Sequence, residues 1–177
     1  MTSDQNVSGG GGAIPVTPTP FSISQIAIVV RDITATMKAY TETLGWGPWS
    51  VFEYKAPLLH DTYVRGEKVD FEMIGAETSV SGLGFELIQP VSGPSIYQEH
   101  LDRFGEGVQH LACMKHSVED SDVLKKHLAE AGSNVIMGGR IGESIEFYYV
   151  DTAPTLKFVL ESGSGHAIDL VPTYFYP

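Results

Sequence analysis

The order of the predicted elements repeats along the chain, and this repeat limits the possible fold more than any other feature. An apolar strand at SISQIAIVV is followed by a helix, TATMKAYTETL, and then by the strands WSVFEY, VDFEMIG and LGFELIQP. The strand GVQHLACMK starts the same order again, with the helix VEDSDVLKKHLAEAG and the strands NVIMGGRI, SIEFYYVD and LKFVLES. The two copies share little sequence. Such a repeat predicts two units that each need the other to bury an apolar face.

The repeat divides the chain into five predicted segments. We expect each unit to curl a mostly antiparallel sheet around a hollow, with its helix outside, which is an α+β fold. Two such sheets side by side make an open cleft, a natural site for a small molecule. The segments are a disordered Gly/Pro/Ser/Thr-rich arm at 1–20, a first βαβββ module at 21–92, a connector with a short helix at 93–106, a second βαβββ module at 107–165, and an aromatic tail at 166–177.

Charge and composition exclude several classes of function. The 177 residues carry a net charge of −11, so the surface repels nucleic acid and anionic lipid, and no basic stripe offsets it. The chain has no uncharged apolar run of about 18 residues, so we expect no transmembrane span. We also expect no secretory signal. The single cysteine, Cys113, forms no internal disulfide and is out of phase with the neighbouring His110, which predicts an inert core thiol in a cytoplasmic protein.

Four polar residues occupy matching places in the two units. Gln25 and His110 stand at the same point of the two first strands, just ahead of the apolar run. Glu86 and Glu161 stand in the two last strands. If the units pair about a pseudo-twofold axis, all four side chains converge. The alternative without a ligand-binding role is a hydrogen-bonded core histidine with two glutamates that face water or a cationic partner.

One amide oxygen, one imidazole nitrogen and two carboxylates form a mixed ligand set for one divalent metal ion. Three or four protein ligands with open positions are typical of a catalytic site rather than a closed structural site. The set contains no thiolate, so zinc is not specially favoured, and zinc, cobalt, nickel or manganese all remain compatible with it.

The same residues resemble the vicinal oxygen chelate (glyoxalase/bleomycin resistance/dioxygenase) superfamily. The resemblance covers about residues 22–162, chiefly the stretches SQIAIVVRDITATMKAYTETLGWGPW, GFELIQPVSGPSIYQEHLDRFGEGVQHLAC and GRIGESIEFYYVDTAPTLKFVLE, and is greatest to the glyoxalase-like branch that contains methylmalonyl-CoA epimerase. It implies a paired βαβββ fold and a homodimer. The first-strand ligand of that branch is usually His, whereas this chain has Gln25. The zinc-using form of glyoxalase I also has Gln there.

The ligand set favours a metal-dependent epimerase or racemase that moves a proton beside a carbonyl group through a stabilised enolate. The resemblance implies Glu161 as the base, and a second carboxylate on the opposite face, for which VDFEMIG offers Asp70 or Glu72. The alternatives are a metal-free protein that sequesters a ligand, as resistance proteins of this superfamily do, a glyoxalase or lyase activity, or a dioxygenase. Gln25 breaks the two-His, one-Glu triad of the dioxygenases.

The sequence leaves the substrate open. The phosphates of a coenzyme A ester require basic residues at the entrance of the site, which the acidic net charge disfavours. Residues that could supply such an entrance are Lys55, Arg65, Lys68 and Arg140. The first three belong to KAPLLHDTYVRGEK, which we expect to be a long loop. The aromatic residues around WGPWSVFEY either close a core or line a pocket, and Tyr148 and Tyr149 alternate, so only one faces the cleft.

Overall fold

The computed structural model describes residues 22–115, 117–166 and 170–177, so the arm predicted at 1–20 lies outside the described residues. The elements in chain order are β1 (Gln25–Val29), α1 (Ile33–Leu44), β2 (Trp49–Tyr54), β3 (Leu59–Val64), β4 (Glu67–Lys68), β5 (Glu72–Val80), β6 (Leu83–Ser92), α2 (Ile96–Phe104), β7 (Gly107–Ala112), α3 (Val118–Glu130), β8 (Val135–Ile141), β9 (Ile145–Val150), α4 (Ala153–Leu156), β10 (Val159–Ser164) and β11 (Tyr174–Tyr176). Within the described residues, the strands form one mixed, mostly antiparallel sheet of eleven strands. The predicted α+β class is therefore confirmed.

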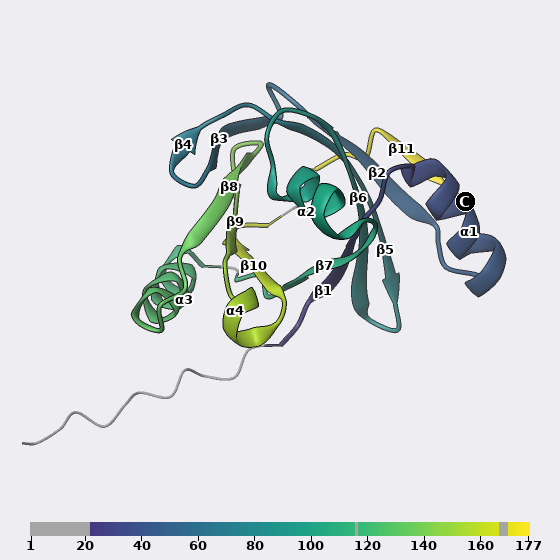
Figure 1. Ribbon diagram of the computed structural model, residues 1–177. Helices are drawn as coiled ribbons and strands as arrows, with labels where there is room; N and C mark the ends of the chain where they lie inside the picture. The colour runs from purple at the N-terminus through teal and green to yellow at the C-terminus, as the bar shows by residue number, and fades with distance from the viewer. Residues whose placement is uncertain (1–21, 116, 167–169) are drawn as a thin grey trace, which may run out of the picture.

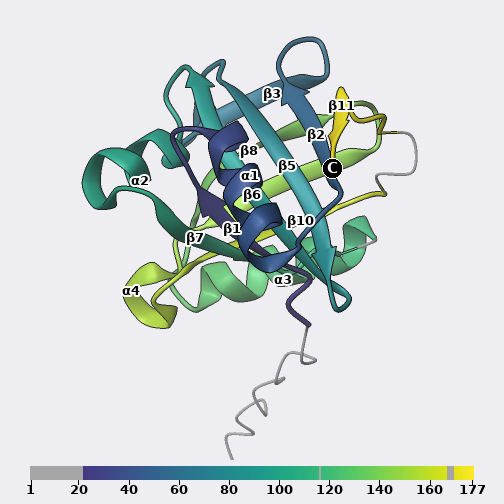
Figure 2. The same cartoon turned by 90° about the vertical axis from the view of Figure 1, so that its right-hand side faces the viewer.

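The sheet contains the predicted repeat. Its order is β11-β2-β5-β6-β1-β7-β10-β9-β8-β3-β4, so the strands of both modules occur in the same relative order on either side of the central pair β1 and β7. These two first strands pair antiparallel and join the modules. Each first strand pairs parallel with the last strand of its own module. The sheet curls on itself, with α1 and α3 on its outer side (Figures 1 and 2).

Local sequence signals explain where α1 begins and ends. The Asp32 carboxylate accepts a hydrogen bond from the Ala35 backbone N–H, which satisfies a donor that the first helical turn leaves free. The helix ends at Gly45, whose φ of 70° is left-handed and favours glycine. Ile33 and Met37 are buried against the outer face of the first module's sheet.

The segment between β2 and β5 differs from its prediction. We expected a long loop, but the segment forms the crossover hairpin (residues 59–68, strands β3 and β4), which pairs with β8 of the second module. Its strand signal is interrupted by a shift of register between His60 and Tyr63, where Asp61 has a φ of 50°. Because that bulge breaks the two-residue alternation of apolar side chains, the sequence reads as a polar loop.

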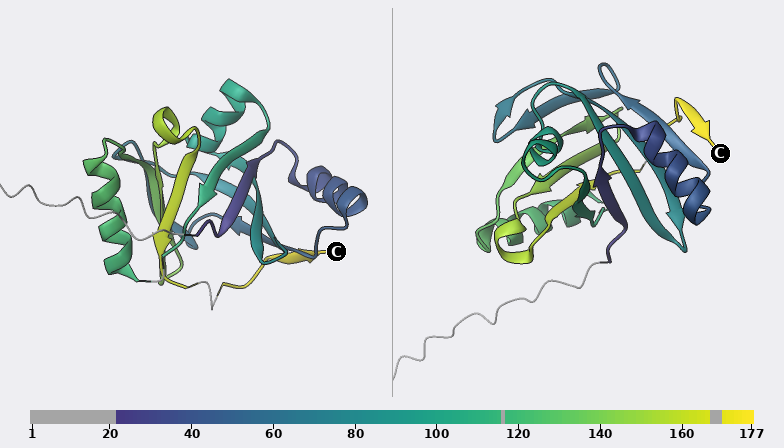
Figure 3. Two further views of the ribbon diagram at one scale, coloured as in Figure 1. Left: turned by 90° about the horizontal axis from the view of Figure 1, so that it is seen from below. Right: turned by 45° about the vertical axis from the view of Figure 1, so that its right-hand side comes forward.

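The end of the chain makes the reciprocal crossing. Strand β11 follows the second module but pairs antiparallel with β2, at the outer edge of the first. The hairpin of the first module therefore extends the second module's half of the sheet, and the strand after the second module extends the first module's half (Figures 1 and 3). Two hydrogen-bonded crossings hold the halves together in addition to the central pair of strands.

The largest apolar cluster lies between the two halves of the sheet. Ile96, Tyr97 and Leu101 of α2 pack into it, so this connector helix covers one end of the curled sheet (Figure 1). The cluster joins side chains of the crossover hairpin, such as Leu59, to strands of both modules. Among the described helices, none has the length and apolar character that a bilayer crossing requires.

Candidate metal centre

The candidate ligands come from four adjacent strands in the middle of the sheet. Glu86 lies on β6, Gln25 on β1, His110 on β7 and Glu161 on β10, and these strands are neighbours in that order. Ala27 of β1 is in register with both Glu86 and His110, so these two side chains flank it on the same face. A methyl group between them leaves room for the carboxylate and the ring to meet.

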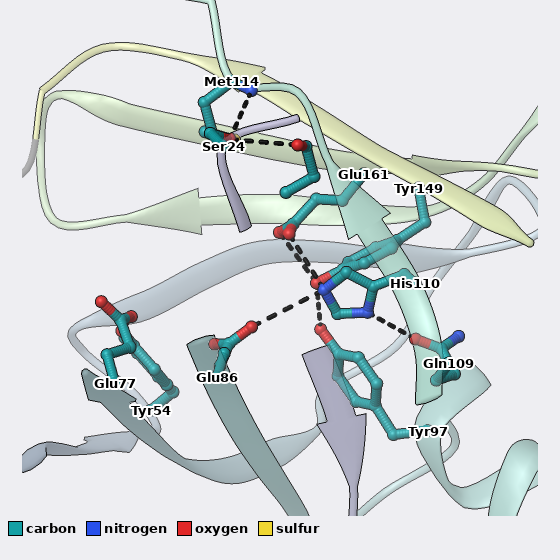
Figure 4. Close-up of polar contacts among 11 residues, drawn as sticks. Ser24, Tyr54, Glu77, Glu86, Tyr97, Gln109, His110, Met114, Tyr149 and Glu161 are labelled. Carbon is teal, nitrogen blue, oxygen red and sulfur yellow. Dashed lines mark hydrogen bonds and ion pairs between the residues drawn. The ribbon is translucent and has the colours of Figure 1, made fainter. Parts of the chain in front are cut away.

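The structure brings three of the four predicted ligands into direct contact. His110 Nε2 lies 3.1 Å from Glu161 Oε2 and 3.6 Å from Glu86 Oε2 (Figure 4). One ligand atom from each residue lies within 4.8 Å of the others. His110 is fully buried, and Glu86 and Glu161 are 7% and 8% exposed. The water-facing alternative for the two glutamates is therefore wrong, because both carboxylates point inward.

The surrounding hydrogen bonds orient the ligands. His110 Nδ1 lies 2.6 Å from Gln109 Oε1 and donates to it, so Nε2 is the ring nitrogen that faces the carboxylates and would bind a metal after losing its proton. The Tyr149 hydroxyl donates to Glu161 Oε1 at 2.8 Å, and the Tyr97 hydroxyl donates to that of Tyr149 at 2.7 Å (Figure 4). Glu161 therefore has one oxygen held by a buried hydroxyl and the other aimed at His110.

The electrostatics of the site favour an added cation. Burial lowers the pKa of His110, but the carboxylates of Glu161 and Glu86 outweigh that effect and raise it to about 9. Burial, followed by the neighbouring charges of Glu86 and Glu161, raises the pKa of Glu77 to about 8. Burial also raises the pKa of Glu86. A dry site with more carboxylates than cations is costly unless further positive charge enters it.

A cavity of about 220 Å³ opens beside these residues. Its polar lining consists of Gln25, the three carboxylates and the hydroxyls of Tyr54 and Tyr149, and the rest is apolar or aromatic, namely Phe52, Met73, Met114, Ile141, Ile145, Phe147 and Leu170. Tyr149 faces the cavity, whereas Tyr148 packs against α3 in a separate cluster, as the alternation requires. Trp46 and Trp49 belong to the outer core beneath α1.

The predicted second carboxylate does not join this site. Glu72 lines a separate hollow with Lys55 and Val91, and Asp70 lines another near Lys68. Met73 and Glu77 of β5 line the cavity, whereas the register of the strand shifts between Glu72 and Met73, and Glu72 lines the neighbouring hollow.

Sequence reasoning missed Glu77, which lines the cavity and is the cross-strand partner of Glu86. We ended this strand at Gly75, but it continues to Val80. Ser81 and Gly82 form a two-residue hairpin turn, and a Ser-Gly pair between two apolar runs is a signal that would have placed Glu77 opposite Glu86.

The residues present fit a divalent metal ion. Among the buried side-chain nitrogen and oxygen atoms of the described residues, His110 Nε2 is the one that makes no hydrogen bond of good geometry, and it faces two carboxylate oxygens. An imidazole lone pair and two carboxylates suit several divalent ions. Gln25 also lines the cavity and is the candidate fourth ligand.

Comparisons with known proteins agree with this description. A family model described as "Glyoxalase/Bleomycin resistance protein/Dioxygenase superfamily" matches residues 24–149. No curated protein sequence matches the chain. Similar solved structures include methylmalonyl-CoA epimerase from Mycobacterium tuberculosis, which is 18% identical over 81% of this chain and 87% of that chain, with a TM-score of 0.55. A hypothetical protein from Bacillus halodurans C-125 is 17% identical over 84% of this chain and 96% of that chain, with a TM-score of 0.59. A methylmalonyl-CoA epimerase in complex with methylmalonyl-CoA and NH4+ is 21% identical over 85% of this chain and 98% of that chain, with a TM-score of 0.51.

Proposed function

The chain belongs to the glyoxalase/bleomycin resistance protein/dioxygenase superfamily, and on that basis we propose that it is a divalent-metal-dependent isomerase that moves a proton beside a carbonyl group. The observation that carries the proposal is the Nε2 of His110, which is fully buried, makes no hydrogen bond of good geometry and faces two carboxylates beside a cavity. The similar epimerase structures agree in fold.

Glu86, His110 and Glu161 would hold the metal, with Gln25 as a fourth ligand. A divalent ion at this place supplies Lewis acidity, which stabilises the negative charge that develops on a carbonyl oxygen when the neighbouring C–H bond breaks. The open side of this ligand set faces the cavity, so the protein's own contribution is to exclude water and to position two groups that transfer protons.

We assign the first proton transfer to Glu161. Its carboxylate takes the proton as the C–H bond breaks, and the electron pair of that bond becomes the enolate. The hydrogen bond from Tyr149 to Oε1 holds the carboxylate against the cavity wall while Oε2 faces His110. Glu161 itself lines the cavity, so it borders the space that a substrate would fill.

We assign the return of a proton to Glu77. It lines the same cavity from β5, and burial raises its pKa, which favours the protonated form that can donate. Donation from Glu77 to the enolate carbon forms the new C–H bond on the other face. In the reverse direction the two carboxyl groups exchange roles.

Isotope exchange separates these roles. A resolved ethyl α-methylbenzoylacetate or methylmalonyl-CoA is incubated with protein in D2O, and both deuterium uptake and loss of optical activity are followed. Glu161→Gln should abolish both. Glu77→Gln should retain deuterium uptake and lose racemisation, because removal and return of a proton on one face needs only one base. Glu72→Gln is the matched control and should behave as wild type. Loss of racemisation in Glu72→Gln alone would transfer the role to that residue.

A metal-free protein that sequesters an aromatic ligand is the second candidate. The stacked rings of Phe52 and Tyr54, whose centroids are 5.6 Å apart, favour it because both line the cavity and could contact an aromatic ligand. Such a protein would bind its ligand equally well with and without metal. A binding titration in the presence and absence of a chelator therefore discriminates the two candidates.

A further inference from the structure

We propose that the site takes an uncharged, apolar carbonyl compound with a flat or aromatic group, and that it does not take a coenzyme A thioester. The inference rests on the proposed function and names the substrate class of the same cavity. Aromatic side chains line two sides of the cavity. Phe52 and Tyr54 stack on one side, and Phe147 and Tyr149 meet edge to face on the other, at a centroid distance of 6.1 Å. Aromatic walls of this kind favour flat apolar ligands.

The charges of the cavity supply the second argument. Three buried or largely buried carboxylates line it, Glu77, Glu86 and Glu161, and no lysine or arginine occurs among the described residues of its lining. A bound divalent ion offsets only the two charges of its ligands Glu86 and Glu161 and leaves no positive charge for a further anion. A substrate that brings its own carboxylate or phosphates would therefore add negative charge where no side-chain cation receives it.

The basic residues that could have formed a phosphate-binding mouth are held elsewhere. Lys68 lines a separate hollow with Asp61 and Asp70. Lys115, although it follows Met114 in the chain, interacts with the Cys113 thiol. The remaining contacts are Lys55 to Glu53 at 2.7 Å, Arg65 to Glu99 at 2.6 Å, and Arg140 to the carbonyl oxygen of Glu143 at 3.0 Å. None of these five basic residues lines the described cavity.

A pair of ligands that differ in charge and by one ester methyl group tests the proposal. Methyl benzoylacetate is uncharged and benzoylacetate carries a carboxylate, and both have an aromatic ring and two neighbouring carbonyl oxygens. Isothermal titration calorimetry on the full chain, with and without Zn²⁺, measures their affinities beside that of methylmalonyl-CoA. We expect the ester to bind about tenfold or more tighter than either anion, because an unpaired buried charge is costly.

A variant that adds a positive charge to the cavity provides a second test. Ile145 lines the cavity, so Ile145→Lys should reduce the preference for the ester and strengthen the binding of benzoylacetate. Leu156→Lys adds the same charge on α4, at a residue that is 50% exposed and outside the cavity, and should leave the preference unchanged. A wild-type-like circular dichroism spectrum shows that each variant is folded.

The outcomes separate this inference from the proposed function. Tighter binding of methylmalonyl-CoA or benzoylacetate than of the ester would overturn the substrate class, while bound metal and proton exchange would leave the isomerase proposal intact. No binding of any of the three probes up to their solubility would also overturn it. Preference for the ester in protein that binds no metal would support the substrate class and contradict the metalloenzyme.

Discussion

Tyr149→Phe removes the hydroxyl that holds Glu161 and leaves the ring in place. The lost hydrogen bond is 2.8 Å long, and Tyr149 is only 1% exposed, so water has little access to replace it. A hydrogen bond to a charged group contributes about 1.5–3 kcal/mol. If all of this orients the ligand carboxylate, metal binding should weaken about 10–100-fold, a range also typical of residues that orient metal ligands.

The same change leaves a second hydroxyl without an acceptor. Tyr97 donates to Tyr149 in the wild-type protein, so Tyr149→Phe should also lower the free energy of unfolding by about 1–3 kcal/mol. Tyr97→Phe combined with Tyr149→Phe removes both hydroxyls and should recover part of that stability, but it should not recover the metal affinity. The two effects are thereby separated.

Competition with a chromophoric chelator for Zn²⁺ measures the affinity, and thermal unfolding measures the stability. Tyr148→Phe is the matched control, because Tyr148 is equally buried but its hydroxyl contacts Ser121 on the other side of the sheet. Unchanged affinity in Tyr149→Phe, or an equal loss in Tyr148→Phe, would refute the orienting role of the hydroxyl.

Three further substitutions test the site and the fold. The pKa of Glu77 is about 8 in the folded protein against 4.5 ordinarily, so the folded state retains a proton that the unfolded chain has released, and stability falls as pH rises through this window. Glu77→Gln should therefore raise the Tm of metal-free protein above about pH 8 and change it little near pH 5, as thermal unfolding at several pH values would show. In the crossover hairpin, Leu59→Ala should cost about 2–5 kcal/mol in urea unfolding because Leu59 is 4% exposed. Arg65→Ala should cost about 0–1 kcal/mol, because its ion pair with Glu99 is exposed; the opposite ranking would contradict packing as the force that holds the hairpin.

Elements whose apolar pattern is uninterrupted could be predicted from the sequence. The strand around Ile28 and the helix from Ile33 to Leu44 have regular spacing and clear ends, and both occur in the structure. The crossover hairpin could not be predicted, because its bulge at Asp61 breaks the alternation and its pairing partner, β8, is far away in the sequence. Long-range pairing of this kind leaves little local signal.

The same distinction applies to the site. Glu86, His110 and Glu161 could be found from the repeat, because equivalent positions of paired modules meet at the central strands. Glu77 has no counterpart in that argument, and its strand seemed to end at Gly75. The position of Glu77 depends on the register of the hairpin between β5 and β6. The turn residues set that register, and the strand propensity of the flanking residues does not.

The most direct test of the metal centre is its stoichiometry. Elemental mass spectrometry on the purified protein, after incubation with Co²⁺, Ni²⁺, Mn²⁺ and Zn²⁺ in turn and removal of free ions, should find close to one divalent ion per chain. His110→Ala and Glu161→Gln should lose it, while Glu72→Gln, whose side chain lies in another hollow, should retain it. Wild-type protein that binds none of these ions, or a folded His110→Ala variant that binds them as well as wild type, would contradict the account.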